Sequence, residues 1–454
     1  MGRPSRRFVW GLVAIAAAAL AVRVAYILLD RSGTGLNPAA GVVGGDAFFY
    51  QKGAWLLPDH GFISPEVYLG TGRRVPAAEH PPLYLLFLSI PSFVNVVSPV
   101  AMMIWSALLG TGTVVLVGLL GREVRGEATG LVAAGLAAVY PNVFSHDGFL
   151  TSETMALFTV TLTLLMAYRY WRAPTTGRAF ALGFATALAT LSRAELGLLF
   201  VILVLPLVLR SRAPGSTPAS RRRLLAVAVI AGVLPIAPWV VFNATRFEKP
   251  VYLSTGFGIT LSSANCDQTY HKPYTGYWNI KCAQDIRDQF VDRSLDQSEQ
   301  DIIFRREATD YIGDNLDRVP TVVLARWGRI TGIWQPWQQV SLDQFPEGRE
   351  EWVAKSALLM WYALLPLAIA GLFVLRARRI PVFPLVALPI TVWVAITLTF
   401  ATTRYRATTE TVMCVLAACA VVSAFEALRS RQPAHDVDLT APEAADVGVP
   451  AATR

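Results

Sequence analysis

The chain has 454 residues, a net charge of +8 and 54% hydrophobic side chains, and only 16% of its residues are charged. Soluble domains average about 25% charged residues, so this apolar surplus is too large for one globular core and must face lipid. The composition excludes a cytosolic globular enzyme, a disulfide-rich secreted module and a disordered protein.

The positive charge is distributed in short groups of arginines that separate apolar segments. Only five of the 40 basic residues are lysines, and the arginines recur as Arg-Ser-Arg, Arg-Arg-Arg and Arg-Ala-Arg-Arg beside apolar runs. Such groups are typical of the cytoplasmic ends of transmembrane helices, so we expect a lipid bilayer and no nucleic acid as partner. The excess of arginine over lysine is a compositional association with GC-rich bacterial genomes and indicates a bacterial plasma membrane.

The first apolar run covers residues 8–29 and follows three arginines. About 22 residues suffice to cross a hydrocarbon layer of ~30 Å. A cleaved signal peptide has a shorter apolar core, whereas this run continues past Arg23, so we expect a retained anchor with a cytoplasmic N-terminus. Residues 30–80 are then expected on the outer face.

Nine further apolar segments follow, at residues 100–120, 128–143, 154–168, 178–192, 196–209, 223–243, 354–375, 380–400 and 408–426. With one crossing per segment, all later arginine groups fall on the cytoplasmic side: Arg122/Arg125, Arg169/Arg172/Arg178, Arg210/Arg212/Arg221/Arg222/Arg223, Arg376/Arg378/Arg379 and Arg429/Arg431. This agreement predicts an all-α polytopic membrane protein with about ten transmembrane helices and both termini inside. It requires residues 83–97 to lie on the outer face as a juxtamembrane or broken helix, because a crossing there would turn every later arginine group outward.

These segments divide the chain into four regions: an N-terminal transmembrane module (1–243) with a first outer loop (30–99), an external soluble region (244–353), C-terminal transmembrane helices (354–430) and a disordered cytoplasmic tail (431–454). The external region is too long to lack structure of its own, and an amphipathic helix is predicted from Asp296 to Asp317.

The cysteines separate into an outer pair and a membrane pair. Cys266 and Cys282 face an oxidising compartment in this topology, and we favour a disulfide over two free thiols. The bridge would close a loop of about 15 residues and contribute about 3 kcal/mol in the chain-entropy model. Cys414 and Cys419 lie in the last apolar segment and are expected to be packing residues. No Cys/His spacing in the sequence is typical of a metal site.

Ionisable residues near the outer membrane face form the candidate site, because charges near lipid are costly and usually mark a functional site. They fall in five segments: Gly44 to Tyr50, Glu79 to Tyr84, Pro141 to Glu153, Ser192 to Glu195 and Thr403 to Arg406. In the last of these, Arg404 and Arg406 break the positive-inside trend, and arginine suits bidentate phosphate binding.

Local chemistry offers structural alternatives for the other four segments. Asp46 suits a turn or helix cap, and the prolines after His80 suit the start of a helix. Asp147 and Glu153 suit a solvated loop, and the pair Arg193 and Glu195 suits a structural ion pair.

The same segments carry short motifs in a characteristic order. The motifs are Gly45-Asp46-Ala47-Phe48-Phe49-Tyr50, His80-Pro81-Pro82-Leu83-Tyr84, Ser152-Glu153-Thr154, Ser192-Arg193-Ala194-Glu195 and Arg404-Tyr405-Arg406. Together they resemble the GT-C membrane glycosyltransferases, in the glycosyltransferase family 39-like branch of protein O-mannosyltransferases and lipid A aminoarabinose transferases. The likeness covers about residues 40–430 and implies a GT-C arrangement of transmembrane helices. The sequence departs from it at Ala47, where mannosyltransferases have a second acid, and at 407–410, where prolines usually follow.

The resemblance implies a hexosyl- or pentosyltransferase that moves a sugar from a polyprenyl-phosphate donor to an acceptor on the outer face, with inversion. The family's acidic residue in the first outer loop is catalytic, and Asp46 matches it as general base. The developing charge on the leaving phosphate needs positive partners, which we expect to be Arg404, Arg406, His80 and Lys52. The remaining site candidates are Tyr50, Glu79, Asp147, Glu153, Arg193, Glu195 and Tyr405.

No cofactor is expected. A divalent cation would require Asp46, Asp147 and Glu153 to converge, and related mannosyltransferases do not need one. The departures from the family leave three acceptor classes open: protein, cell-wall glycan and glycolipid. A transporter or flippase of a lipid-linked sugar is an alternative, although this sequence shows none of the internal repeats common in transporters. A non-catalytic membrane subunit is another.

Overall fold

The computed structural model describes residues 2–32, 45–210, 217–292, 294–344 and 348–430. Regular structure in these residues is helical, apart from one isolated β-bridge between Ile63 and Pro76. The predicted all-α class is therefore confirmed for this part of the chain. The tail at 431–454, predicted to be disordered, lies outside the described residues.

Helices occur at all ten predicted apolar segments: α1 (Arg6–Tyr26), α5 (Pro99–Arg125), α6 (Glu127–Val139), α8 (Glu153–Arg172), α9 (Thr176–Ser192), α10 (Leu205–Leu209) with two short helical turns before it, α11 (Pro218–Ala244), α18 (Glu351–Ala377), α19 (Phe383–Leu398) and α20 (Thr403–Ser430). Five of these are long and apolar enough to cross a membrane, namely α1 with its extension to Arg31, α5, α11, α18 and α20, and the bent unit that begins with α6 would make a sixth. The structure thus shows a multi-pass, all-helical membrane protein with five or six candidate spans, and ten crossings stay a prediction.

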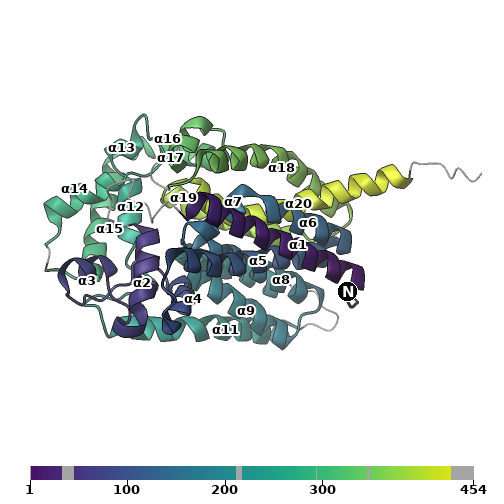
Figure 1. Ribbon diagram of the computed structural model, residues 1–454, viewed down its shortest axis with the longest axis horizontal. Coiled ribbons are helices and arrows are strands. Elements are labelled where there is room, and N and C mark those ends of the chain that lie inside the picture. Colours follow the sequence, from purple (N-terminus) through teal and green to yellow (C-terminus); the bar gives the residue numbers. More distant parts are fainter. Residues whose placement is uncertain (1, 33–44, 211–216, 293, 345–347, 431–454) are drawn as a thin grey trace, which may run out of the picture.

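The long helices run side by side in one bundle (Figure 1). Small residues let them approach closely. A Cβ atom at Gly183 of α9 would lie 1.9 Å from the carbonyl oxygen of Ala228 in α11. A Cβ atom at Gly371 of α18 would lie 2.0 Å from the carbonyl oxygen of Leu416 in α20. Small residues at helix crossings are characteristic of membrane bundles, where close packing replaces the hydrophobic effect between helices.

The segment predicted as one crossing at 128–143 is broken by a proline. α6 ends at Val139, Tyr140 is extended, and α7 (Pro141–Phe144) starts a new direction at 70° to α6. Proline disfavours the helical conformation of the residue before it, which explains the break at Tyr140. The break turns Asn142 to Gly148 into the bundle, where all of these residues are buried.

Residues 83–97 are too short as helix to cross a bilayer. α4 (Leu83–Ser89), Ile90 and the 3-10 helix Pro91–Val94 together cover 12 residues, or about 18 Å at 1.5 Å per residue. This length supports the juxtamembrane interpretation, since a crossing needs about 20 residues.

The remaining helices gather at one end of the bundle, opposite the N-terminus and the end of α20 (Figure 1). They are α2 (Asp46–His60), α3 (Pro65–Thr71), α12 (Phe257–Ala264), α13 (Asp267–Tyr270), α14 (Ile280–Phe290), α15 (Gln297–Asp314), α16 (Val319–Ile330) and α17 (Pro336–Gln344). α15 corresponds to the helix predicted from Asp296. The Asp296 carboxylate accepts from the backbone N–H groups of Ser298 and Glu299 and so caps its first turn.

A disulfide joins Cys266 and Cys282, as the sequence predicts, and connects the start of α13 to α14. Cys414 and Cys419 are buried among the helices of the core and have no disulfide partner. Their placement agrees with a packing role.

We expect Cys266 and Cys282 to resist alkylation until the protein is reduced. Replacing either cysteine with serine should lower the free energy of unfolding of the outer helices by up to about 3 kcal/mol, because the unfolded chain regains the freedom that the bridge removes. Mass spectrometry after alkylation, with and without reductant, checks the pairing. Ready alkylation of both thiols in the native, unreduced protein would contradict it.

Candidate active site

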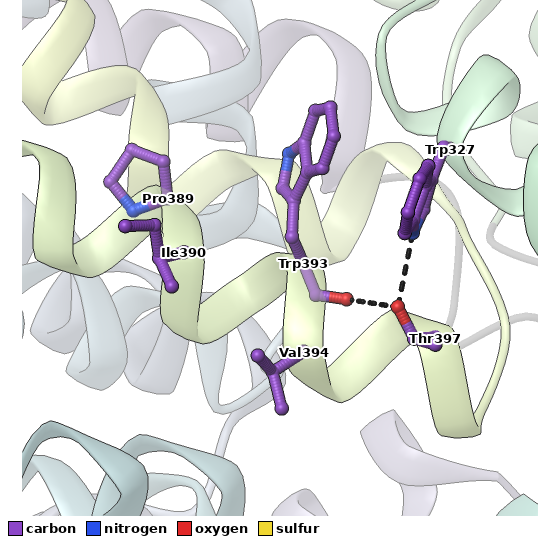
Figure 2. A pocket seen from close by; sticks show the side chains of 6 residues that line it. All are labelled: Trp327, Pro389, Ile390, Trp393, Val394 and Thr397. Atoms are coloured by element: carbon purple, nitrogen blue, oxygen red, sulfur yellow. Dashed lines mark hydrogen bonds between the residues drawn. The ribbon is translucent and has the colours of Figure 1, made fainter. Parts of the chain in front are cut away.

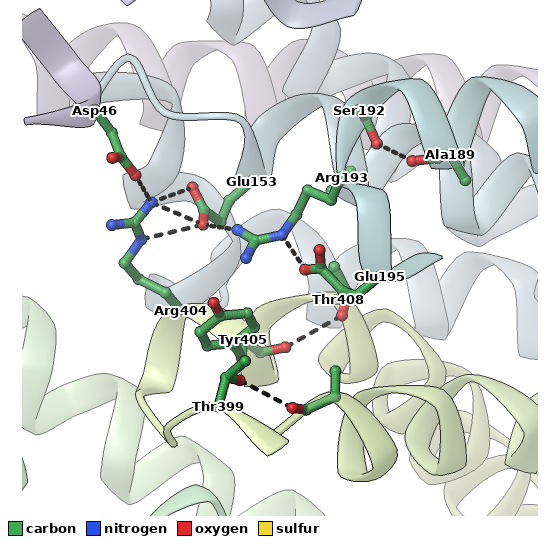
Figure 3. A network of polar contacts seen from close by, with 12 residues as sticks. Asp46, Glu153, Ala189, Ser192, Arg193, Glu195, Thr399, Arg404, Tyr405 and Thr408 are labelled. Carbon is green, nitrogen blue, oxygen red and sulfur yellow. Dashed lines mark hydrogen bonds and ion pairs between the residues drawn. The ribbon is translucent and has the colours of Figure 1, made fainter. Parts of the chain in front are cut away.

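Charged residues at the ends of four helices lie close together in one network (Figure 3). Asp46 is the first residue of α2, Glu153 is the first of α8, Arg193 follows α9, and Arg404 is the second residue of α20. Gly45 precedes Asp46 with φ +88°, a conformation that favours glycine. Gly45, not Asp46, therefore occupies the cap position of α2, so the alternative that Asp46 is a helix cap is wrong.

Arg404 connects two carboxylates across the site. Its Nη2 donates to Asp46 Oδ2 at 2.6 Å, and its Nε donates to Glu153 Oε1 at 3.1 Å. Glu153 is buried and also accepts from Arg193 Nη1. The Arg193 guanidinium pairs with Glu195 as well and lies 4.6 Å from the ring centre of Tyr405. The structural ion pair considered for Arg193 and Glu195 is thus present, and it belongs to the same network as Asp46.

His80 lies on the other side of Asp46. Its Nε2 is 3.3 Å from Asp46 Oδ1, and its ring stacks on Tyr50 with ring centres 5.1 Å apart. The side chain of Asp46 is 33% exposed, which leaves the carboxylate accessible from outside the protein. Asp46 therefore faces two cationic groups while keeping an open side.

Partial removal from water by itself raises the pKa of Asp46, but the positive charges of Arg404 and His80 outweigh this effect and hold the pKa well below its usual value. For His80, burial lowers the pKa, and the charge of Asp46 more than compensates, so that the net pKa is raised. Asp46 is consequently ionised at neutral pH, and a larger share of His80 carries a positive charge than for a free histidine.

Several predicted site residues lie elsewhere. Arg406 points away from Arg404: its Nε donates to Glu410 at 2.6 Å, and its guanidinium lies 4.3 Å from the ring centre of Trp361. Because both groups of this ion pair are buried within the bundle, the structure does not bring Arg406 to Asp46.

Asp147 and Lys52 also make their contacts outside the network of Asp46 and Arg404, as far as the described residues show. The Asp147 carboxylate pairs with Arg23 of α1 at 2.8 Å and accepts from the hydroxyl of Thr154. The Lys52 ammonium lies 5.5 Å from the ring centre of Trp55 on the same helix. Within the described ranges, no group of three His, Cys, Asp or Glu side chains is placed to hold a metal ion.

Gln297 of α15 is a site-supporting residue that sequence reasoning missed. Its Oε1 accepts from the backbone N–H of Ala78 and from the hydroxyl of Thr255, each at 3.1 Å. Its Nε2 donates to Glu79 Oε1, also at 3.1 Å. Gln297 thus fixes the chain immediately before His80 from a helix more than 200 residues later. No local pattern marks it, because its partners come together only in the folded protein.

An apolar pocket of about 310 Å³ lies between α16 and α19, lined by Trp327, Pro389, Ile390, Trp393, Val394 and Thr397 (Figure 2). Trp327 packs on Ile330, Val392, Ile396 and Ala401, and Tyr405 packs on the same cluster. The same apolar cluster therefore contacts both Trp327, which lines the pocket, and Tyr405, which lies beside Arg193 in the charged network.

Comparison with known proteins identifies one matching family. Residues 79–242 match the family described as dolichyl-phosphate-mannose-protein mannosyltransferase. This segment includes His80, Glu153 and Arg193, and it leaves Asp46 and Arg404 outside the matched range. A comparison with curated proteins finds no match.

Three solved structures match this chain at low sequence identity, and the two with a TM-score of 0.50 share its fold. The apo oligosaccharyltransferase of Archaeoglobus fulgidus has a TM-score of 0.50 at 15% identity, covering 93% of this chain and 51% of that chain. The oligosaccharyltransferase AglB of the same organism, in complex with an inhibitory peptide and a dolichol-phosphate, has a TM-score of 0.50 at 17% identity, with the same coverage. ArnT from Cupriavidus metallidurans bound to undecaprenyl phosphate has a TM-score of 0.42 at 14% identity, covering 92% of this chain and 78% of that chain.

The chain spans about half the length of the oligosaccharyltransferases that it matches. At these identities the likeness shows the fold alone. Together with the family match, it confirms the resemblance inferred from the outer-face motifs.

Proposed function

We propose, on the premise that residues 79–242 carry the dolichyl-phosphate-mannose-protein mannosyltransferase pattern, that this protein is a membrane glycosyltransferase using a polyprenyl-phosphate-linked sugar. The observation that supports it best is the contact between Asp46 and Arg404, which places a carboxylate and a guanidinium side by side at the end of a membrane bundle. That arrangement suits a reaction in which a hydroxyl loses a proton while a phosphate leaves.

Asp46 is proposed as the general base. Its carboxylate takes the proton of the acceptor hydroxyl while that oxygen bonds to the anomeric carbon of the sugar. The bond from this carbon to the phosphate oxygen breaks, and the electron pair leaves with the polyprenyl phosphate. Attack from the face opposite the leaving group inverts the anomeric centre.

Arg404 is proposed to bind the donor phosphate, with His80 as a second positive partner and Lys52 as a further candidate on α2. A guanidinium matches the geometry of phosphate oxygens and stabilises the charge that develops on them. A phosphate bound to Arg404 would compete with Asp46 for the guanidinium. The basicity of Asp46 would then rise when the donor is in place, which couples donor binding to proton transfer.

The lipid part of the donor needs an apolar path beside the network. The pocket between α16 and α19 offers such a surface, and the cluster of Ile330, Val392, Ile396 and Ala401 connects it to Tyr405. The dolichol-phosphate in the archaeal complex belongs to the same chemical class as the lipid part of the proposed donor. We extend the proposal to a bacterial plasma membrane with the active face outside, and to a protein, glycan or glycolipid acceptor.

The proposed function is tested with purified protein and radiolabelled polyprenyl-phosphate sugars. Release or transfer of the sugar supports a glycosyltransferase. Movement of the intact lipid across vesicles without loss of sugar would favour a flippase instead, and neither activity would favour a non-catalytic subunit. A screen of donors in membranes would identify the sugar.

The ten-crossing topology predicts which positions are accessible from outside. Single cysteines at residues 60 and 300 should react with an impermeant maleimide in intact cells, whereas cysteines at 125 and 378 should react only after the membrane is opened. The end of the bundle that carries Asp46 would then be external. External labelling at 125 would contradict this topology and the outward orientation of the site.

Gln297→Ala should lower the transfer rate by roughly 10-fold to 100-fold, because small displacements at a reacting centre have large effects. The lost hydrogen bonds should also cost about 1–3 kcal/mol of folding stability. Gln300→Ala is the matched control: it lies on the same helix, and its amide donates to the carbonyl of Leu295, away from the site. Equal rates for the two variants would show that Gln297 does not position His80.

A further inference from the structure

Residues 319–344, which comprise α16, α17 and the turn between them, expose no charged side chain at the proposed outer end of the molecule. The only charged residues in this range are Arg326, Arg329 and Asp343, and all three are buried. In contrast, Leu324 is 62% exposed, Ile333 80% and Trp337 63%. Large exposed apolar side chains in a segment without exposed charge are typical of an interaction surface.

Both arginines of α16 are directed into the protein. Arg326 donates to the carbonyl oxygens of Ala264 and Thr397. Arg329 donates to the carbonyl oxygen of Thr275 and to Gln338 Oε1. Both guanidinium groups thus find hydrogen-bond acceptors inside the protein. Such internal acceptors are needed where the exposed side of a helix contacts lipid and not water.

Hydrogen bonds to α18, a candidate span, and to the shorter apolar helix α19 fix the height of this surface in the bundle. Trp361 and Tyr362 of α18 donate to the carbonyl oxygens of Thr331 and Gly332. Trp361 lies 15 residues before Arg376, or about 22 Å along α18 at 1.5 Å per residue. These bonds would be impossible if the turn lay far above the bilayer, because Trp361 itself falls within a hydrocarbon layer of ~30 Å measured from Arg376.

A hydrogen bond to α19 gives the same height of α16 above the predicted cytoplasmic end of the bundle, independently of α18. Trp327 donates to Thr397 Oγ1, and Thr397 lies 14 residues after Phe383, about 21 Å along α19. On α19 the residues facing the pocket, Ile390, Trp393 and Val394, are exposed and apolar. The uncharged surface of α16 and α17 therefore adjoins the exposed apolar residues of α19, a 16-residue helix that the sequence predicts to cross the membrane.

We propose that α16 and α17 lie in the outer interfacial layer of the bilayer, with Leu324, Ile333 and Trp337 in contact with lipid. Tryptophan is enriched at this depth because its ring is amphipathic. The second half of the external region is then a membrane-bound element and not part of a soluble loop. Arg406 Nη1 donates to the carbonyl of Ile330, so this element is also joined to α20 close to Arg404. The inference is independent of the proposed enzymatic function.

α15 provides a matched contrast within the same region. It exposes the charged side chains of Arg305 and Arg306 beside Ile302, which is 44% exposed. An exposed isoleucine next to charges is expected to face water. Ile302 therefore serves as the control for Ile333.

The test uses the full-length protein in nanodiscs with single cysteines carrying the fluorophore NBD at positions 324, 333, 337 and 302. The native cysteines should not interfere, since Cys266 and Cys282 are bridged and Cys414 and Cys419 are buried. Unsubstituted protein controls for background labelling. Ser341→Cys is an additional variant that removes no apolar side chain. Ser341 is exposed one turn after Trp337, so labelling at this position still tests the surface if a variant of an apolar residue fails to fold.

We expect lipids with a quencher in the upper acyl chain to reduce NBD emission at 324, 333 and 337 at least twofold more than at 302. Emission at these three positions should also be shifted to the blue. Water-soluble iodide should show the opposite order. Equal lipid quenching at 333, 337 and 302 would overturn the proposal, as would iodide access at 333 equal to that at 302.

Discussion

Asp46→Asn should lower the rate of sugar transfer by about 10²–10⁴-fold, the range expected when a general base is removed. Asparagine keeps the size and shape of aspartate but cannot take a proton at neutral pH. Donor affinity should change little, because a base acts mainly in the transition state. Turnover under saturating donor, together with direct donor binding, measures the two effects separately.

A purely structural role for Asp46 predicts a different result. A turn residue would allow asparagine to serve nearly as well as aspartate, and the main consequence would be a small change in stability. Thermal unfolding of Asp46→Asn distinguishes loss of chemistry from loss of fold. A well-folded variant with a near-normal transfer rate would remove Asp46 from the mechanism. Asp46→Glu should retain part of the activity only if the longer side chain still reaches the acceptor oxygen.

Arg404→Ala should lower turnover by about 10²–10³-fold and also weaken donor binding, since it removes the proposed phosphate ligand. It leaves Glu153 buried with one cationic partner fewer, and breaking such a buried pair typically costs about 3–5 kcal/mol of stability. Arg404→Lys keeps the charge but loses the two-pronged geometry, so its effect on donor use should be smaller. Donor KM and unfolding temperature of both variants provide the measurement.

Arg406→Ala is the matched control for this experiment. Arg406 lies on the same helix and is also buried against a carboxylate, but its partner is Glu410 and not Asp46. It should lose stability on a similar scale while the surviving folded protein keeps its donor KM. If Arg404→Ala and Arg406→Ala raise the donor KM equally, or if neither does, Arg404 has only a structural role.

The pH dependence of the Arg404 variants tests the coupling within the site. Arg404 and His80 hold the pKa of Asp46 below its usual value against the effect of burial. Losing the Arg404 charge therefore raises this pKa, and a larger share of Asp46 is protonated on the acid side of neutrality. The acid limb of the rate profile should move to higher pH in Arg404→Ala and less so in Arg404→Lys. An unchanged acid limb in both would show that Asp46 does not control it.

The sequence alone determined the membrane-spanning character and most of the helices, because these depend on local properties. Apolar segments long enough for a bilayer and flanking arginines are visible within about 20 residues. The same short range suffices for the start of α15 after Asp296 and for each of the short motifs taken singly. The candidates Asp46, His80, Glu153, Arg193 and Arg404 follow from their place in short segments and from the resemblance that these segments carry, and the structure brings all five together.

Only the tertiary structure decided how these residues pair. Asp46 and Arg404 are separated by 358 positions in the sequence, and nothing local specifies their contact. The sequence places the last apolar segment at residues 408–426, whereas α20 already begins at Thr403. Two positions along a helix turn about 200°, so Arg404 faces Asp46 while Arg406 faces Glu410 inside the bundle. Likewise, Asp147 is directed to Arg23 of α1, because the proline break after α6 turns that segment inward. Helix ends, crossings and distant partners are set by packing of the whole chain, and that is why the membership of the site required the fold.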